Sequence, residues 1–144
     1  MLNNIILASK SKVRKEILKK NNIVCNVEPS NVDEDAVKES LQKERASPEI
    51  ISKNLAELKA NKVSLLKKDQ IVIGADSVID LNGELISKPE SRDQAMLILK
   101  KLNGKNHFLI SSVCISKNGQ MIWNYTDKAK LKMKNFSDEE LKEY

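Results

Sequence analysis

Short apolar runs alternate with helical stripes along the first half of the chain. Continuous apolar runs of strand length predict buried strands at residues 5–8, 23–27 and 70–81. Apolar residues spaced three or four apart predict helices at residues 11–20 and 48–67, the second starting with a Ser-Pro pair typical of a helix N-terminus. The predicted buried faces are Val13, Ile17 and Leu18 in the first helix, and Ile51, Leu55, Leu58, Lys62 and Leu65 in the second.

Two hairpins and a capped helix are predicted in the second half of the chain. Asn-Gly pairs at residues 82–83 and 118–119 are strong hairpin signals, and strands are expected beside them at 84–86, 107–116 and 120–134. Between the hairpins a capping box precedes a third helical stripe, which ends in a glycine suited to a helix C-terminus. The residues of this helix are Ser91 and Gln94 in the box, Ala95, Ile98, Leu99 and Leu102 on the buried face, and Gly104 at the end.

A second capping box, from Ser137 to Glu140, lies close to the end of the chain. The chain then ends at Tyr144 after about two helical turns, and an isolated helix this short is marginal. We therefore expect one domain over residues 1–144 that lacks its C-terminal part; a frayed tail is the alternative. The order of elements predicts an α/β (α+β) protein with helices covering a sheet.

Length and composition narrow the class of protein. The 144 residues are 40% hydrophobic and 31% charged, which predicts one folded domain rather than a disordered chain. No apolar run approaches the roughly 18 residues of a membrane span, so no membrane partner is expected. The first residues carry no positively charged lead-in, which argues against a signal peptide and favours the cytoplasm.

The formal net charge of +5 points to an anionic ligand. The three arginines are Arg14, Arg45 and Arg92, and scattered lysines are poor readers of bases. The five aromatic residues all follow residue 107. A nucleic-acid partner is therefore not expected. A basic RNA-binding module is kept only as an alternative hypothesis.

The cysteines and the single histidine argue against a zinc site, a disulfide framework and a Ser-His-Asp hydrolase. Cys25 and Cys114 lie in apolar runs without metal-ligand spacing, which predicts reduced core residues. His107 is the single histidine and begins a predicted strand, so a core or edge position is expected. A Ser-His-Asp hydrolase is thereby disfavoured.

The turn after the first predicted strand is a candidate anion site. Ser9 and Ser11 supply hydroxyls, and Arg14 adds charge at a helix N-terminus, where backbone N–H groups attract phosphate. Lys10 and Lys12 add further charge. The alternative is an ordinary serine-capped basic helix.

Two acidic positions are candidates for catalysis or metal binding. Asp76 follows Gly74 at the end of an apolar run and could act as a general base or a metal ligand. Glu34 lies in the acidic segment 32–35, which is expected to be a loop with oxygen ligands suited to a hard divalent cation. The alternatives are a turn aspartate and a solvated loop in which Asp33 caps a helix.

Two lysines complete the set of candidates. Lys88 precedes Pro89 and is therefore held extended after a predicted hairpin, and Lys59 lies on the long second helix. Taken alone, each is more simply a surface lysine.

The order of these segments resembles the Maf family of nucleoside triphosphate pyrophosphatases, also called septum formation inhibitor proteins. The motifs are Ile-Leu-Ala-Ser-x-Ser-x-x-Arg from Ile6, Val-Asp-Glu from Val32, Leu-Ala-x-x-Lys-Ala from Leu55, Gly-Ala-Asp-Ser from Gly74, and Lys-Pro at Lys88. The resemblance implies an elongated mixed sheet flanked by helices around a central cleft, a fold like that of inosine triphosphatase.

The resemblance also implies an activity and roles for the candidates. It implies hydrolysis of the α–β bond of standard or non-standard nucleotides to a monophosphate and diphosphate, with Mg²⁺ or Mn²⁺ as cofactor. Asp76 matches the proton acceptor, and Glu34 with Asp76 would hold the metal. The phosphate-binding residues implied are Ser9, Ser11, Arg14, Lys59 and Lys88.

Departures from the family pattern set the remaining expectations. Val13 and Ser77 stand where subgroups differ in base preference, and they match neither the Arg and Thr of the dTTP and UTP subgroup nor the Trp and Gln of the 7-methyl-GTP subgroup. Family members continue for roughly another fifty residues. If this chain is complete at residue 144, exposed apolar sheet surface is expected to favour association, for example as a homodimer, or aggregation. A nucleotide-binding regulator of cell division without turnover is the alternative function.

Overall fold

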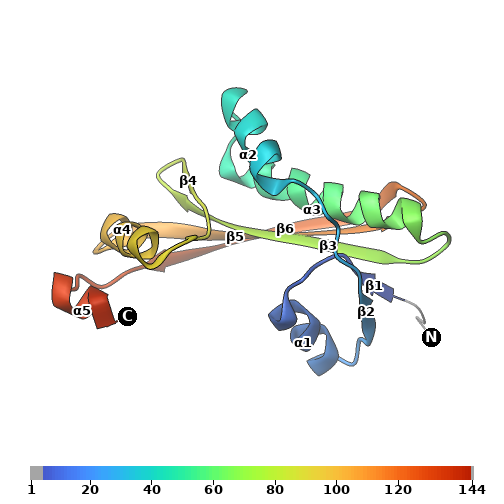
Figure 1. Cartoon of the computed structure of the whole chain (residues 1–144), viewed down its shortest axis with the longest axis horizontal. Helices are drawn as coiled ribbons and strands as arrows, with labels where there is room; N and C mark the ends of the chain where they lie inside the picture. The colour runs from blue at the N-terminus through green and yellow to red at the C-terminus, as the bar shows by residue number, and fades with distance from the viewer. Residues whose placement is uncertain (1–4, 144) are drawn as a thin grey trace.

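The computed structural model describes residues 5–143. Residues 1–4, which begin the segment used to argue against a signal peptide, and Tyr144, the expected point of truncation, lie outside the described residues. In chain order the elements are β1 (Ile5–Leu7), α1 (Lys12–Lys20), β2 (Cys25–Val27), α2 (Glu34–Lys43), α3 (Pro48–Leu66), β3 (Val72–Leu81), β4 (Glu84–Ile86), α4 (Arg92–Leu102), β5 (Asn106–Lys117), β6 (Gln120–Lys132) and α5 (Asp138–Glu143) (Figure 1).

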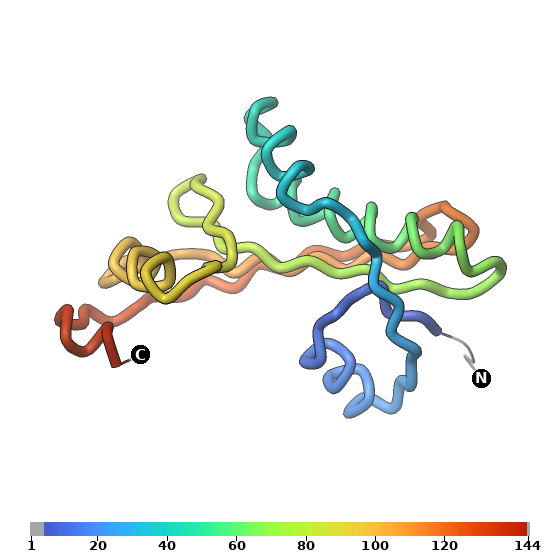
Figure 2. The backbone as a smooth tube through the Cα atoms, viewed as in Figure 1, coloured from blue at the N-terminus to red at the C-terminus, as the bar shows by residue number. Residues whose placement is uncertain are grey.

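The strands form one mixed sheet in the order β2-β1-β3-β5-β6, with β4 paired to β3. Strand β1 is parallel to both β2 and β3, whereas the β3–β5 and β5–β6 pairs are antiparallel. Figure 2 shows α3 running along one face of the long strands, the β1-α1-β2 unit on the opposite side, and α4 with α5 at one end. The predicted elongated mixed sheet with flanking helices is confirmed.

Helix α3 packs closely on the sheet because small residues meet at the contact. Ala56 and Ala60 are buried against Gly74 of β3. A Cβ atom at Gly74 would lie 2.7 Å from the backbone nitrogen of Ala60, which is closer than real Cβ atoms approach other atoms. The glycine therefore sets the distance between helix and sheet. The surrounding core consists of Ile6, Ala8, Ala56, Ala60, Val63, Val72 and Cys114.

The predicted buried face of α3 is partly wrong. Ile51 and Leu55 are buried as expected, but Leu58 and Leu65 are 42% and 70% exposed. Lys59 is only 7% exposed instead. The helix turns its small residues toward the sheet, which allows close approach, and this rotation carries the neighbouring lysine inward and the large leucines outward.

Helix α1 also buries less than predicted. Val13 and Ile17 are exposed, and only Leu18 packs against the cluster around Ile5 and Cys25. The helix has nine residues and lies beside β2 at the edge of the sheet. Its apolar contact with the core is therefore made by Leu18. Its predicted start at Ser11 and end at the Asn21-Asn22 pair are confirmed.

The acidic segment expected to be a loop begins helix α2. The side chain of Asp33 accepts a hydrogen bond from the Ala36 backbone N–H at 3.1 Å and caps this helix, as the alternative interpretation proposed. No residue of α2 is buried. Its partly buried apolar residues are Val37 and Leu41, a single pair that is too short to predict a helix from the apolar pattern.

The second half of the chain follows its predicted pattern. Both Asn-Gly turns have positive φ at each residue, as a type I′ hairpin requires. Helix α4 is capped by Ser91, and Gly104 has a φ of 69° just after its end. At the second capping box Ser137 and Glu140 each accept the other's backbone N–H, and Leu141 is buried.

Several smaller expectations can be compared with the structure. Cys25 and Cys114 are free and buried, and His107 is buried at the start of β5, as predicted. Strand β6 forms one end of the sheet order and exposes apolar residues, among them Trp123 and Tyr125. Association through such a surface, as a homodimer, stays a prediction. None of the helices within residues 5–143 has both the length and the apolar character of a membrane span.

Candidate functional site

The turn between β1 and α1 fixes Arg14 through two serines. The Ser9 hydroxyl is buried and accepts hydrogen bonds from the Ser11 backbone N–H at 3.1 Å and from Nη1 of Arg14 at 3.2 Å. Ser11 caps α1 by accepting from the Arg14 backbone N–H at 3.3 Å. The guanidinium is thereby held beside the positive end of the helix dipole, where an anion is stabilised.

Lys59 joins two carboxylates at the centre of the site. Its ammonium donates to Oδ1 of Asp76 at 3.2 Å and to the carbonyl of Ala75 at 3.2 Å, and it forms an ion pair with Glu34. The three partners come from β3 and from the first turn of α2. The hydroxyl of Ser52 also donates to the Asp76 carbonyl at 3.2 Å. These bonds fix the position of the Asp76 side chain relative to α3.

The two carboxylates respond differently to this environment. Burial raises the pKa of Asp76, and this effect outweighs the attraction of Lys59. At Glu34 burial also favours the neutral form, but the hydrogen bond and charge of Lys59, with Lys38 and Arg14, lower the pKa overall. The site therefore shifts the two pKa values in opposite directions, and burial makes Asp76 a stronger base than an ordinary aspartate.

The two oxygens of Asp76 differ in their hydrogen bonds. Oδ2 is buried and has no hydrogen-bond partner among the described residues, whereas Oδ1 is bonded to Lys59. Within residues 5–143 no three His, Cys, Asp or Glu side chains are grouped to hold a metal. The two carboxylates suit a cation such as Mg²⁺, which commonly binds one or two carboxylates and completes its shell with water and substrate phosphates.

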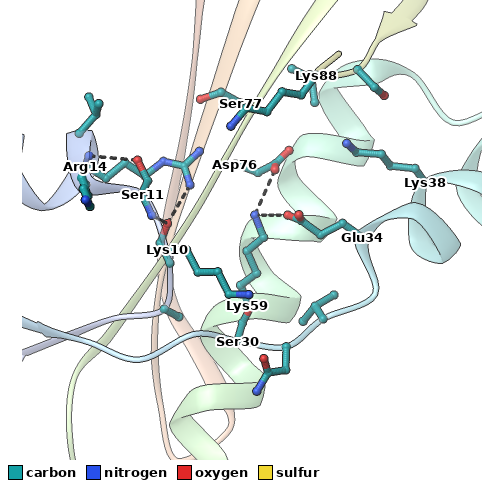
Figure 3. Close-up of a pocket in the computed structure, with 18 of the residues that line it drawn as sticks. Lys10, Ser11, Arg14, Ser30, Glu34, Lys38, Lys59, Asp76, Ser77 and Lys88 are labelled. Atoms are coloured by element: carbon teal, nitrogen blue, oxygen red, sulfur yellow. Dashed lines mark hydrogen bonds and ion pairs between the residues drawn. The ribbon is translucent and has the colours of Figure 1, made fainter. Parts of the chain in front are cut away.

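A cavity of about 590 Å³ joins these groups (Figure 3). Its lining brings together every candidate from the sequence, although they are spread over eighty positions of the chain. These residues are Ser9, Ser11, Val13, Arg14, Glu34, Lys59, Asp76, Ser77 and Lys88. Lys59, Lys88 and Asp76, which the alternative interpretations treat as surface lysines and a turn aspartate, therefore line the same cavity.

The lining also contains residues that the sequence did not single out. Lys38 extends from α2 toward Asp76, from the side opposite Arg14 in Figure 3. The one available signal was its spacing of four residues from Glu34, which places both on one face of a helix. The cavity contains six cationic side chains and two carboxylates, a formal surplus of four positive charges: Lys10, Lys12, Arg14, Lys38, Lys59 and Lys88 against Glu34 and Asp76.

Comparisons with known proteins agree with one another. A family model described as Maf-like protein matches residues 4–144. A nucleoside triphosphate pyrophosphatase of Pelagibacter ubique is 67% identical over 144 residues, which are 100% of this chain and 74% of that protein. The protein of that name from Caulobacter vibrioides is 42% identical over 143 residues, or 99% of this chain and 71% of its own.

Solved structures share the fold at much lower identity. A HAM1 protein from Coxiella burnetii superposes with a TM-score of 0.55 at 15% identity, covering 90% of this chain and 71% of its own. A nucleoside-triphosphatase described as a dITP/XTP pyrophosphatase, from Mycobacterium abscessus, gives a TM-score of 0.53 at 12% identity, covering 90% and 73%. These likenesses concern the fold.

Proposed function

The chain belongs to the Maf-like protein family, and from this membership we propose that it is a nucleoside triphosphate pyrophosphatase. The proposed reaction is hydrolysis of the bond between the α- and β-phosphates, which releases a nucleoside monophosphate and pyrophosphate. The enzyme would thus be a hydrolase acting on acid anhydrides.

The observation that carries the proposal is the charge of the central cavity. A triphosphate carries about four negative charges, which matches the surplus of positive side chains around Asp76. Hydrolysis of a phosphoanhydride depends chiefly on positioning and on electrostatic stabilisation of the transferred group. Arg14 and Lys88 supply that charge without a carboxylate partner among residues 5–143.

Asp76 is the proposed general base. Oδ1 is held by Lys59, so the side chain cannot rotate freely, and Oδ2 is the atom available to accept a proton from water. The raised pKa of Asp76 increases its affinity for that proton. The proton would pass to Oδ2 as the water oxygen forms its bond to phosphorus and the anhydride bond breaks.

Mg²⁺ or Mn²⁺ is the proposed cofactor, with Glu34 and Asp76 as its protein ligands. Both carboxylates contact the Lys59 ammonium and therefore lie close together, which supports this assignment because Mg²⁺ commonly binds one or two protein carboxylates. The metal, when bound, would neutralise phosphate charge and polarise the phosphorus.

Val13 and Ser77 are the proposed contacts to the base. Both line the cavity, with Val13 on α1 and Ser77 on β3. Ser77 is also hydrogen-bonded to the hydroxyl of Ser111 at 3.2 Å, which orients it from the neighbouring strand. We propose that the substrates include non-standard nucleotides. We also propose that the reaction takes place in the cytoplasm.

The test is product analysis on a panel of standard and modified nucleoside triphosphates with Mg²⁺ or Mn²⁺. We expect equal amounts of monophosphate and pyrophosphate, and a kcat about a thousandfold lower for Asp76→Asn, because general bases contribute roughly a hundred- to ten-thousandfold. Asp127→Asn changes an exposed carboxylate on β6 and is the matched control. Release of single phosphates, or triphosphate binding without turnover, would reject the proposed reaction.

A further inference from the structure

Helix α2 directs two charged residues into the cavity. Glu34 is its first residue and Lys38 lies one turn later, and both line the cavity. The helix has no buried residue, so packing in a core does not account for the direction of this face. Lys43, nearer the end of the helix, is instead exposed and pairs with Glu39.

Lys38 differs from Lys59 in how its charge is used. Lys59 is neutralised by two carboxylates in the resting site. Lys38 forms no ion pair with a carboxylate of residues 5–143, although it lies close enough to Glu34 and Asp76 to favour their ionised forms. Its ammonium is therefore available to an anion that enters the cavity.

The Lys38 side chain enters the cavity from a different element than Arg14. Arg14 approaches Asp76 from α1, and Lys38 approaches it from the opposite side (Figure 3). An α-phosphate placed beside Oδ2 of Asp76 would leave the rest of a triphosphate to extend away from that carboxylate. The β- and γ-phosphates carry most of the negative charge, and an unpaired ammonium on a separate wall is suited to receive them.

We propose that Lys38 is a substrate-binding residue that contacts the pyrophosphate part of the triphosphate. This inference rests on the proposed function and adds a cation that the motif at the first turn does not include. Lys38 stabilises negative charge that grows on the departing pyrophosphate when the anhydride bond breaks. The nucleoside monophosphate product lacks that group and does not contact Lys38.

The test is calorimetric titration of the whole chain with inorganic pyrophosphate and, separately, with a nucleoside monophosphate, in the presence of Mg²⁺. Lys38→Met keeps the length of the side chain but removes the charge. We expect about tenfold weaker binding of pyrophosphate, since hydrogen bonds to charged groups are among the stronger ones. Monophosphate affinity should change less than about twofold.

Two further variants separate contact from folding. Lys38→Arg should recover most of the pyrophosphate affinity, and Lys43→Met, on the outer part of the same helix, should bind like the original chain. Unchanged pyrophosphate affinity in Lys38→Met, or equal losses for both ligands, would overturn the inference. Pyrophosphate binding that depends on Lys38, in a chain that hydrolyses no triphosphate, would reject the proposed reaction while supporting the contact.

Discussion

Removing the charge of Lys59 tests how the centre of the site is held together. Lys59→Met retains an unbranched apolar side chain in the same buried space but deletes the ammonium that contacts Asp76, Glu34 and the Ala75 carbonyl. Two carboxylates would then face each other without the cation between them. We expect this change to lower the free energy of unfolding and to alter its dependence on pH.

The magnitude follows from burial. Deleting one partner of a buried ion pair costs about 3–5 kcal/mol, because the other charge stays buried and unpaired. The side chains of Lys59 and Asp76 are 9% and 8% exposed, so this range applies to their pair. Glu34 is 43% exposed and water screens much of its charge, so its share is small. We therefore expect a loss of about 3 kcal/mol near neutral pH.

The stability lost in Lys59→Met should be smaller in acid than at neutral pH. The direction of this pH dependence follows from the pKa shifts of the two carboxylates. The pKa of Asp76 is already raised by burial, and removal of Lys59 raises it further. A carboxyl whose pKa is higher in the folded protein than in the unfolded chain holds its proton more tightly when folded. The stability of Lys59→Met therefore falls as pH rises from the ordinary aspartate pKa through the raised one.

Glu34 contributes in the same direction. Its pKa is lowered in the folded protein, so it adds stability above its ordinary pKa that disappears as pH falls through the folded value. The variant loses the part of this stability that Lys59 supplies. Both carboxylates therefore make the difference between the original chain and Lys59→Met larger at neutral pH than in acid.

The assay is urea denaturation of both proteins at about pH 3.5, below the ordinary pKa values of both carboxyls, and at about pH 7.5. Lys53→Met is the control, because Lys53 is half exposed and forms a surface pair with Glu49, and we expect it to change stability by less than about 0.5 kcal/mol. Adding Glu34→Gln to Lys59→Met should restore part of the loss. An equal loss at both pH values, with no recovery in the double variant, would show that packing rather than charge dominates at Lys59.

Two further predictions concern the contact between helix and sheet and the pH profile. Gly74→Ala should cost about 1–3 kcal/mol in urea denaturation, because its Cβ would lie 2.7 Å from the Ala60 nitrogen and force α3 outward; a change below about 0.5 kcal/mol would contradict the close contact. If Asp76 is the base, the acid limb of kcat/KM should lie above the ordinary aspartate pKa of 3.8. Glu34→Gln should move this limb to lower pH, since the Glu34 charge raises the pKa of Asp76; an upward shift would contradict the assignment.

The sequence predicted the elements with a clear local signal. Both Asn-Gly hairpins, the three helices with serine caps and the C-terminal capping box were found, because each depends on residues that are neighbours in the chain. Helix α2 was missed because its partly buried apolar residues, Val37 and Leu41, are a single pair and too few to form a detectable stripe. Its cap, Asp33, was recognised only as an alternative.

The orientation of helices depended on contacts that the sequence does not display. The α3 stripe was counted from its large apolar residues, and the packing instead selected Ala56 and Ala60, since Gly74 on a distant strand makes room for them. The burial of Lys59 is a consequence of that choice. Periodicity alone could not show that a lysine would be buried and Leu58 exposed.

The candidate site was predicted by a different route. Single residues gave weak signals, and the order of motifs selected nine residues that the fold brings to one cavity. The ion pairs among Lys59, Glu34 and Asp76 could not be read from spacing, because the three come from separate elements. Lys38 was missed because helix α2, on which it lies, was not predicted.

The distribution of charge in the cavity would allow the proposed triphosphate to bind without first breaking the ion pairs at its centre. Lys59 is compensated by Glu34 and Asp76 at the base of the cavity, and these bonds position Oδ2 before any ligand arrives. Arg14 and Lys38 stand on opposite sides and form no ion pair among the described residues. An entering phosphate chain therefore gains attraction from the walls while the central bonds persist. Because that attraction increases with each added phosphate, the proposed triphosphate substrate would bind more tightly than the monophosphate product.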